Sequence, residues 1–301
     1  MSWSKKYRHA EHAHTVTEHG SSATGQEHEA HHSHEHVHGA NQEQSYSPMH
    51  THHHGEGHAP MTEPLTEPLL ELRNLEKRFG QVQAVDQVSL SIREGECLGL
   101  IGESGSGKST TAYLAAGLLL PDEGEVIYRG GHLQMVFQNP RSSMDPRRKV
   151  LDNICEGMWY HRHGLSKEEI RKRALEMMDM VQLSRSYADR YTRELSGGEC
   201  QRAAIARAIL VKPRLLICDE VTSALDVSVQ AQIIRLLDQL KRELGLSFLF
   251  ISHDIALVSS FCDRVAVMYQ GKIVEEGTAM EVIQTPREAY TRRLIDSVLT
   301  L

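Results

Sequence analysis

Residues 97–109 read CLGLIGESGSGKS, five apolar residues that run into a glycine-rich loop ending in lysine and serine. The apolar run predicts a strand covered on both faces, and a helical pattern from Thr110 to Leu119 follows the loop. Glycines let backbone N–H groups turn towards phosphate oxygens, and a helix N-terminus adds partial positive charge. The spacing G-x-x-x-x-G-K-S therefore predicts a phosphate-binding loop between a strand and a helix.

Two side chains of this loop carry specific expectations. Lys108 is expected to contact the β- and γ-phosphates of a nucleotide, and the Ser109 hydroxyl to ligate Mg²⁺. A glycine-rich turn that matches by chance is the alternative, and the strand and helix on either side argue against it. The candidate nucleotide-binding residues of the segment are Gly102, Glu103, Ser104, Gly105, Ser106, Gly107, Lys108, Ser109 and Thr110.

A second apolar run, Leu215 to Cys218, ends in two carboxylates, Asp219 and Glu220. Sites of parallel sheets lie at the carboxyl ends of the strands, so these acids are expected beside the phosphate loop. We expect Asp219 to hold Mg²⁺ and Glu220 to act as general base on the attacking water. Two acidic residues at the end of a strand could simply be solvated loop residues. Because this pair follows a phosphate loop earlier in the chain, the catalytic interpretation is favoured.

A third segment, LSGGECQR at residues 195–202, precedes a helix predicted over Ala203 to Val211. Ser196 can cap this helix, and Gly197 and Gly198 leave backbone N–H groups open to a second anion. One nucleotide needs only one such helix start. The second one therefore predicts a nucleotide held by a neighbouring subunit, and with it a dimer.

The remaining pattern alternates strands and helices. Strands are expected at residues 69–73, 88–92, 247–251 and 264–268, helices at 166–181 and 226–244, and a hairpin turn at Gln270-Gly271. Ser166 with Glu169 forms a capping box, and Gly245 supplies a helix stop. This order predicts one α/β domain with a mainly parallel sheet and helices on both faces.

The amino-acid composition argues against several classes of protein. The 301 residues carry a formal net charge of -7, which argues against nucleic-acid binding. No apolar run approaches the roughly 18 residues of a membrane-spanning helix. The five cysteines are odd in number and never form a CxxC pair, which argues against a disulfide framework and a cysteine zinc site.

Residues 1–64 differ from the rest, because fifteen of the nineteen histidines fall before residue 60 and large apolar side chains are scarce. We expect a disordered tail. Two interpretations stay open: the tail binds or buffers a transition metal such as Ni²⁺ or Zn²⁺, or it is a solvating extension. The candidate metal ligands are His31, His32, His34, His36, His38, His52, His53 and His54.

From Leu69 to Leu301 the chain resembles the ATP-binding subunit of ABC transporters. Residues 102–109 are similar to its Walker A loop, 215–220 to Walker B, and 195–201 to its LSGGQ signature. Gln138 resembles the Q-loop glutamine, Asp226 the D-loop aspartate and His253 the switch histidine, with a hydrogen-bonded core histidine as the alternative. Phe79 resembles the aromatic residue that stacks on adenine, with core packing as the alternative.

The resemblance implies a RecA-like ATPase core at residues 65–301, with an antiparallel β subdomain and a helical subdomain at about 141–199. Two such chains would close head to tail over two ATP molecules, each held by Lys108 and Ser109 of one chain and Ser196, Gly197 and Gly198 of the other. Glu220, His253 and Gln138 would serve hydrolysis, with Ser109, Gln138 and Asp219 at Mg²⁺. The partners implied are a second ATPase subunit (a paralogue or an identical chain), two membrane permeases and an extracytoplasmic solute-binding protein, at the cytoplasmic face of the inner membrane.

Residues 138–147 and the tail YTRRLI at 290–295 resemble the peptide/nickel importer branch. With the histidines, this likeness predicts an importer of nickel or a related metal. A di- or oligopeptide importer is the first alternative, and a soluble ABC protein such as a phosphonate-lyase accessory subunit is another. The span from Lys108 to Gln138 is about ten residues shorter than in most members, and Glu199 replaces the usual signature glutamine.

Overall fold

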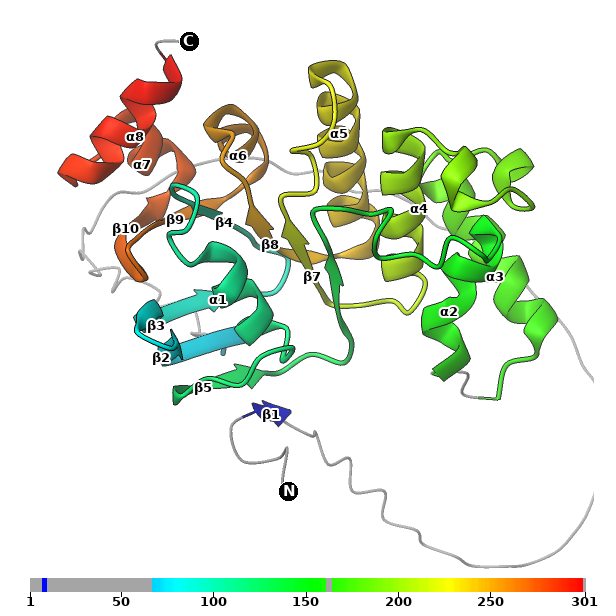
Figure 1. Ribbon diagram of the computed structural model, residues 1–301, viewed down its shortest axis with the longest axis horizontal. Coiled ribbons are helices and arrows are strands. Elements are labelled where there is room, and N and C mark those ends of the chain that lie inside the picture. Colours follow the sequence, from blue (N-terminus) through cyan, green and yellow to red (C-terminus); the bar gives the residue numbers. More distant parts are fainter. Residues whose placement is uncertain (1–6, 10–66, 161–163, 300–301) are drawn as a thin grey trace, which may run out of the picture. The chain divides into compact units, whose positions relative to one another are not determined.

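The computed structural model describes residues 7–9, 67–160 and 164–299. Its larger sheet has six strands in the order β10-β9-β4-β8-β7-β6. Their bounds are β4 Cys97–Ile101, β6 Leu133–Val136, β7 Leu215–Asp219, β8 Ser247–Ile251, β9 Arg264–Tyr269 and β10 Lys272–Thr278. All neighbouring pairs are parallel except β9 and β10. The expected mainly parallel sheet is confirmed, and β4 lies inside it (Figure 1).

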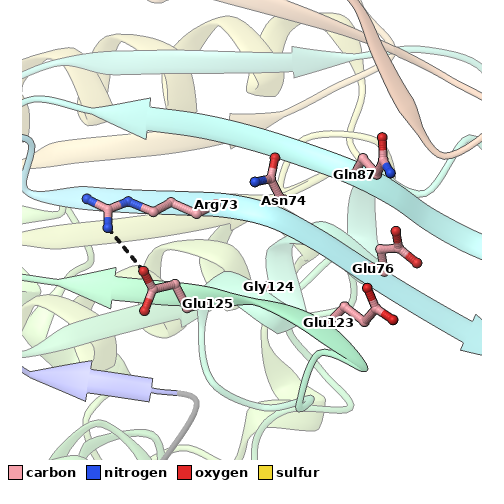
Figure 2. A pocket seen from close by; sticks show the side chains of 7 residues that line it. All are labelled: Arg73, Asn74, Glu76, Gln87, Glu123, Gly124 and Glu125. Atoms are coloured by element: carbon pink, nitrogen blue, oxygen red, sulfur yellow. Dashed lines mark hydrogen bonds and ion pairs between the residues drawn. The ribbon is translucent and has the colours of Figure 1, made fainter.

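A second sheet, of order β1-β5-β2-β3, covers one side of the first. Its strands are β1 Tyr7–His9, β2 Leu70–Phe79, β3 Val82–Ile92 and β5 Glu123–Tyr128, and β2 is antiparallel to both of its neighbours. This is the expected antiparallel part of the fold. A hollow of about 770 Å³ lies over it, where Glu76 and Glu123 stand in register on adjacent strands (Figure 2).

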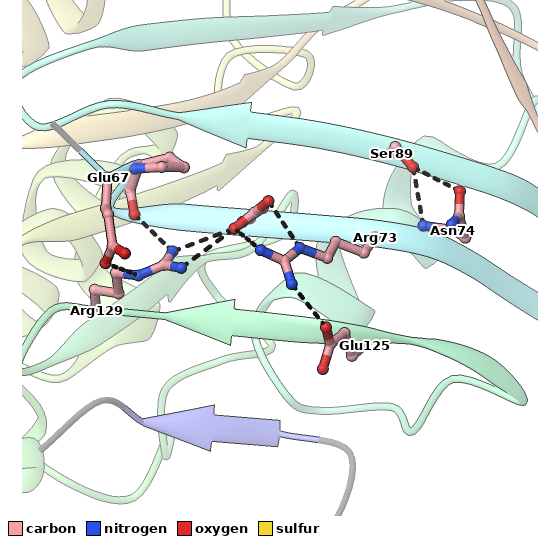
Figure 3. A network of polar contacts seen from close by, with 8 residues as sticks. Glu67, Arg73, Asn74, Ser89, Glu125 and Arg129 are labelled. Carbon is pink, nitrogen blue, oxygen red and sulfur yellow. Dashed lines mark hydrogen bonds and ion pairs between the residues drawn. The ribbon is translucent and has the colours of Figure 1, made fainter. Parts of the chain in front are cut away.

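Charged side chains tie the strands of the second sheet together. The Arg73 guanidinium donates to Glu71 on its own strand, at 2.8 Å, and to Glu125 on β5, at 3.0 Å. Arg129 pairs with Glu67 at 2.8 Å and with Glu71 at 3.3 Å, so the two arginines share one carboxylate (Figure 3). These pairs are partly exposed, and each is worth at most about 1 kcal/mol.

The short strand β1 lies within the segment expected to be a tail. It pairs in parallel with β5, from Tyr7 opposite Val126 to His9 opposite Tyr128. The sequence predicted no strand here, because three residues are too few to show the alternation of apolar and polar side chains that marks a strand. The edge of β5 offers unpaired N–H and C=O groups, which can accept any extended segment. The rest of the expected tail lies outside the described residues.

The large sheet is covered by different elements on its two faces. Side chains of β4 alternate: Leu98 and Leu100 pack with the second sheet and α1 (Lys108–Ala115), whereas Cys97 and Ile101 pack with the helices of the other face. Helices α5 (Val227–Leu244) and α6 (Ile255–Phe261) belong to that other face, and α7 (Ala279–Gln284) and α8 (Ala289–Leu299) lie near β9 and β10 (Figure 1). Helix α1 is shorter than the expected run to Leu119, because Gly117 adopts a φ of 70°.

The helical subdomain is built from α2 (Val150–Tyr160), α3 (Lys167–Met180), two short 3-10 turns, Arg185–Tyr187 and Thr192–Glu194, and the start of α4 (Gly197–Ile209). The span expected for this subdomain, about 141–199, includes α2, α3 and both turns, and its boundaries stay a prediction. The predicted capping box of Ser166 and Glu169 is present, and Asp226 and Gly245 begin and end α5 as expected. A second helix boundary, after that of α1, was also wrong: α4 begins at Gly197, not Ala203. Ser196 and Glu199 form a second capping box that outweighs the low helix propensity of two glycines.

The expected hairpin turn at residues 270–271 is confirmed. Gln270 and Gly271 form the β9–β10 turn, both at positive φ, as a two-residue hairpin requires. All five cysteines are free and buried, although the Cys97 and Cys262 sulfurs, far apart in sequence, lie 3.5 Å apart. No helix among the described residues is long and apolar enough to span a bilayer.

Candidate functional site

The phosphate loop lies where β4 ends and α1 begins, as the sequence predicted. It lines a cavity of about 490 Å³ through Ser104, Gly105, Gly107, Lys108, Ser109 and Thr110. Gly107 has a φ of 110°, and a Cβ there would lie 2.2 Å from the Ala84 carbonyl oxygen. Only glycine fits this position, so the backbone itself forms this part of the cavity wall.

Lys108 is drawn back into this loop. Its ammonium donates to the carbonyl oxygens of Gly102 at 2.8 Å and Glu103 at 2.7 Å, and the residue is 5 % exposed. Burial lowers the pKa of Lys108, while the nearby carboxylates of Glu220 and Asp219 oppose the shift. A buried ammonium held by two neutral carbonyls and, at 3.5 Å, by the Ser106 hydroxyl is suited to a polyanionic ligand such as a triphosphate.

Asp219 ends β7 next to the start of α1, as expected. The Ser109 hydroxyl donates to its Oδ1 at 3.1 Å, so a hydroxyl and a carboxylate oxygen converge. Burial raises the pKa of Asp219, the Ser109 hydrogen bond lowers it, and the Glu220 charge raises it further. Two hard oxygen donors at the phosphate cavity fit Mg²⁺, which is normally held by one or two such protein groups together with phosphates.

Glu220 and Gln138 line the same cavity, and His253 lies beside Glu220. The Gln138 Nε2 donates to Glu220 Oε2 at 2.7 Å, and His253 Nδ1 lies 3.7 Å from Glu220 Oε1. Glu220 has a φ of 47°, and its N–H donates to the Ile251 carbonyl at the end of β8. The His253 side chain is 63 % exposed, so the alternative of a core histidine is wrong. Three predicted residues from three loops thus form one cluster.

Ser196, Gly197 and Gly198 are not among the residues that line this cavity. Ser196 caps α4, and a Cβ on Gly198 would lie 2.8 Å from Val229 Cγ1 on α5. Asp226 caps α5: its Oδ1 accepts from the Ser228 hydroxyl and the Val229 N–H, which lower its pKa in that order. The signature segment and the D-loop aspartate are therefore neighbours at two adjacent helix starts.

Phe79 ends β2 beside the cavity residue Val82 and is 49 % exposed, so core packing is excluded for it. Lys77 Nζ lies 5.8 Å from the centre of its ring. Sequence reasoning missed five cavity residues: Val82, Gln83, Ala84, Gln270 and Gly271. They come from two hairpin segments with no nucleotide-binding motif. Tertiary contacts reveal the connection: the Gly271 N–H donates to Ser106 O at 2.9 Å, and the Ala84 carbonyl lies against Gly107.

The proposed metal ligands of the N-terminal segment cannot be placed in this geometry. His31, His32, His34, His36, His38, His52, His53 and His54 lie outside the described residues. Among the residues that the structure does describe, no group of three or more His, Cys, Asp or Glu side chains is arranged to hold a metal ion.

A phosphate loop facing a carboxylate-ended strand defines a P-loop nucleotide-binding protein. Residues 85–223 match the family model described as ABC transporter. The chain is 42 % identical over 254 residues to the oligopeptide transport ATP-binding protein OppF of Bacillus subtilis, covering 78 % of this chain and 83 % of that one. The Escherichia coli protein of that name is 45 % identical over 232 residues, covering 72 % and 70 %.

A solved dimeric ATP-binding cassette, in a post-hydrolysis state with ADP and phosphate, superposes with a TM-score of 0.64 at 32 % identity, covering 70 % of this chain and 98 % of that one. The chain therefore belongs to the ATP-binding proteins of ABC transporters, in the peptide/nickel importer branch. It is an ATP-hydrolysing enzyme coupled to transport, with ATP and Mg²⁺ in use.

Proposed function

We propose that this chain hydrolyses ATP to drive import of oligopeptides, as one of two ATPase subunits beneath two membrane permeases fed by an extracytoplasmic binding protein. The observation that supports oligopeptides as the cargo is the sequence identity of 42–45 % to relatives named for oligopeptide transport. The names of these relatives suggest the class of cargo, and the cavity at the phosphate loop supports the ATPase activity. The assembly places this chain at the cytoplasmic face of the membrane.

Each predicted residue has a role in this scheme. Lys108 and the loop N–H groups hold the phosphates, and Ser109 and Asp219 would hold Mg²⁺, which neutralises phosphate charge when bound. Glu220 takes the proton of the attacking water, and Gln138 and His253 flank its two carboxylate oxygens at 2.7 and 3.7 Å. Phe79, exposed at the end of β2, stacks on the adenine.

Ser196, Gly197 and Gly198 serve a nucleotide of the partner subunit. They form the start of a helix longer than three turns, capped and next to α5, and they stand apart from this chain's own cavity. A helix start of this kind binds anions through its N–H groups and its dipole. Asp226, at the neighbouring helix start, lies at the same face of the ATPase.

A second cargo, nickel or a related transition metal, is favoured by one observation: fifteen of nineteen histidines precede residue 60. Neutral imidazoles bind Ni²⁺, Cu²⁺ and Zn²⁺. In this scheme His31, His32, His34, His36, His38, His52, His53 and His54 bind Ni²⁺ or Zn²⁺ and transfer or buffer it after uptake.

The two cargoes can be separated with the purified transporter in liposomes, ATP inside. We expect tripeptides added with the binding protein to accumulate and to stimulate hydrolysis, and Ni²⁺ to do neither. Nickel uptake without peptide uptake would refute the peptide proposal. If neither cargo stimulates hydrolysis and the chain does not copurify with permeases, the soluble alternative holds. The matched control is a chain lacking residues 1–64: peptide uptake should persist, whereas tail-dependent metal uptake would be lost.

A further inference from the structure

The peptide group between Gly102 and Glu103, at the start of the phosphate loop, is hydrogen-bonded on both sides. Its carbonyl oxygen accepts from Lys108 Nζ at 2.8 Å, and its N–H donates to the Tyr290 hydroxyl at 3.0 Å. In a trans peptide the N–H and C=O point in opposite directions. The lysine and the tyrosine therefore hold one rigid plane from opposite sides.

Tyr290 belongs to α8, far along the chain from the loop, and is itself held firmly. It is 7 % exposed, and its ring packs against Tyr269, the last residue of β9, with ring centres 4.1 Å apart and planes inclined by 32°. Burial raises the pKa of the Tyr290 hydroxyl, so the group stays neutral and accepts the Glu103 N–H at physiological pH.

The start of α8 is anchored independently of the loop. The Glu275 carboxylate on β10 accepts the backbone N–H groups of Arg287 at 2.7 Å and Glu288 at 3.1 Å, just before the helix begins. Carboxylates are favourable at a helix N-terminus, where N–H groups lack partners. The Tyr290 hydroxyl is thus presented from a fixed helix, not from a loose terminus.

The loop has little freedom to compensate for a lost contact at this point. A Cβ on Gly102 would lie 2.1 Å from the Met268 carbonyl oxygen, so the loop begins in tight contact with β9. The Gly102 carbonyl is one of two that hold the Lys108 ammonium. A rotation of the 102–103 peptide would therefore move that carbonyl and change where the ammonium rests.

We propose that Tyr290 is a positioning residue for ATP binding: its hydroxyl fixes the Gly102–Glu103 peptide and, through it, the resting place of Lys108. The C-terminal helix α8 thereby supports the nucleotide loop directly. This inference rests on the role of the phosphate loop proposed above. A loop held in its binding arrangement loses less entropy when nucleotide binds, so the contact contributes to affinity and not to the chemical step.

The test compares Tyr290→Phe, which removes only the hydroxyl, with Tyr269→Phe as a matched control. Within the described part of the chain, the Tyr269 hydroxyl accepts only from the Gln270 side chain, at 3.2 Å, and makes no hydrogen bond to the phosphate loop. Full-length chains are titrated with MgADP and MgATP, steady-state hydrolysis is measured in the assembled transporter, and amide hydrogen exchange is followed at Glu103.

Loss of one neutral hydrogen bond corresponds to an affinity about five-fold weaker. For Y290F we expect Kd and KM to rise by about that factor, kcat to stay within two-fold, and exchange at the Glu103 amide to accelerate, with Y269F like wild type. The proposal is overturned if Y290F matches wild type in Kd and Glu103 exchange, or if Y269F changes both equally, because ring packing alone would then explain the residue.

A third variant separates the two proposals. Lys108→Ala tests the loop itself: undiminished nucleotide binding by K108A would overturn the phosphate-loop assignment. Loss of binding in K108A together with wild-type behaviour in Y290F would leave the nucleotide site standing and overturn only the role of Tyr290.

Discussion

Replacing Glu220 with glutamine tests the assignment of the general base most directly. Glutamine has the same shape, and its amide oxygen can still accept the Gln138 hydrogen bond that Glu220 Oε2 accepts at 2.7 Å. The backbone at φ 47° is equally accessible to both residues. We therefore expect the free energy of unfolding to change by less than about 1 kcal/mol.

The chemical effect should be far larger. A positioned general base contributes about 10²–10⁴ in rate, which is roughly 3–5 kcal/mol of barrier. Because the amide cannot take a proton from water, E220Q should lose that factor in kcat while Lys108 and the loop still bind MgATP. A subunit that binds ATP without hydrolysing it should also remain paired with its partner for longer.

The assay is phosphate release by the purified transporter at saturating MgATP, together with nucleotide titration and gel filtration with ATP. The control is Glu123→Gln, an exposed carboxylate on β5 that does not line the cavity. Hydrolysis by E220Q within three-fold of wild type would refute Glu220 as the base. Loss of ATP binding in E220Q would show that the carboxylate acts in binding instead.

Three further predictions concern the loop, a helix cap and the thiols. Gly107→Ala puts a Cβ 2.2 Å from Ala84 O and should weaken MgATP binding more than ten-fold in titration, whereas Gly131→Ala, with open space around it, should not. Ser196→Ala and Ser166→Ala each remove a capping-box serine and should each cost about 1 kcal/mol in urea unfolding, but only S196A should impair hydrolysis. All five cysteines are buried, and burial raises the pKa of Cys155 to about 11. The thiols should therefore react with Ellman's reagent at pH 8 only after denaturation, and fast labelling of the native chain would contradict this.

Helix boundaries show where local sequence was sufficient and where it misled. Asp226 and Gly245 mark the ends of α5 because a cap is a contact between residues three or four positions apart. The start of α4 was placed six residues late, since two glycines read as a loop. Their helical conformation depends on Ser196 and Glu199 and on packing against Val229, and the latter is a tertiary contact.

The phosphate loop, the carboxylate-ended strand and the family could be predicted from the amino-acid order, because each motif is a short run of backbone and side-chain chemistry. The meeting of distant groups became clear from the folded chain: Gln138 with Glu220, Gly271 with Ser106, Cys97 with Cys262 and Tyr290 with Glu103. Such contacts depend on strand order and on the docking of α8, and neither is encoded in the spacing of any one segment. Single hydrogen bonds between segments therefore become visible only once the chain is folded.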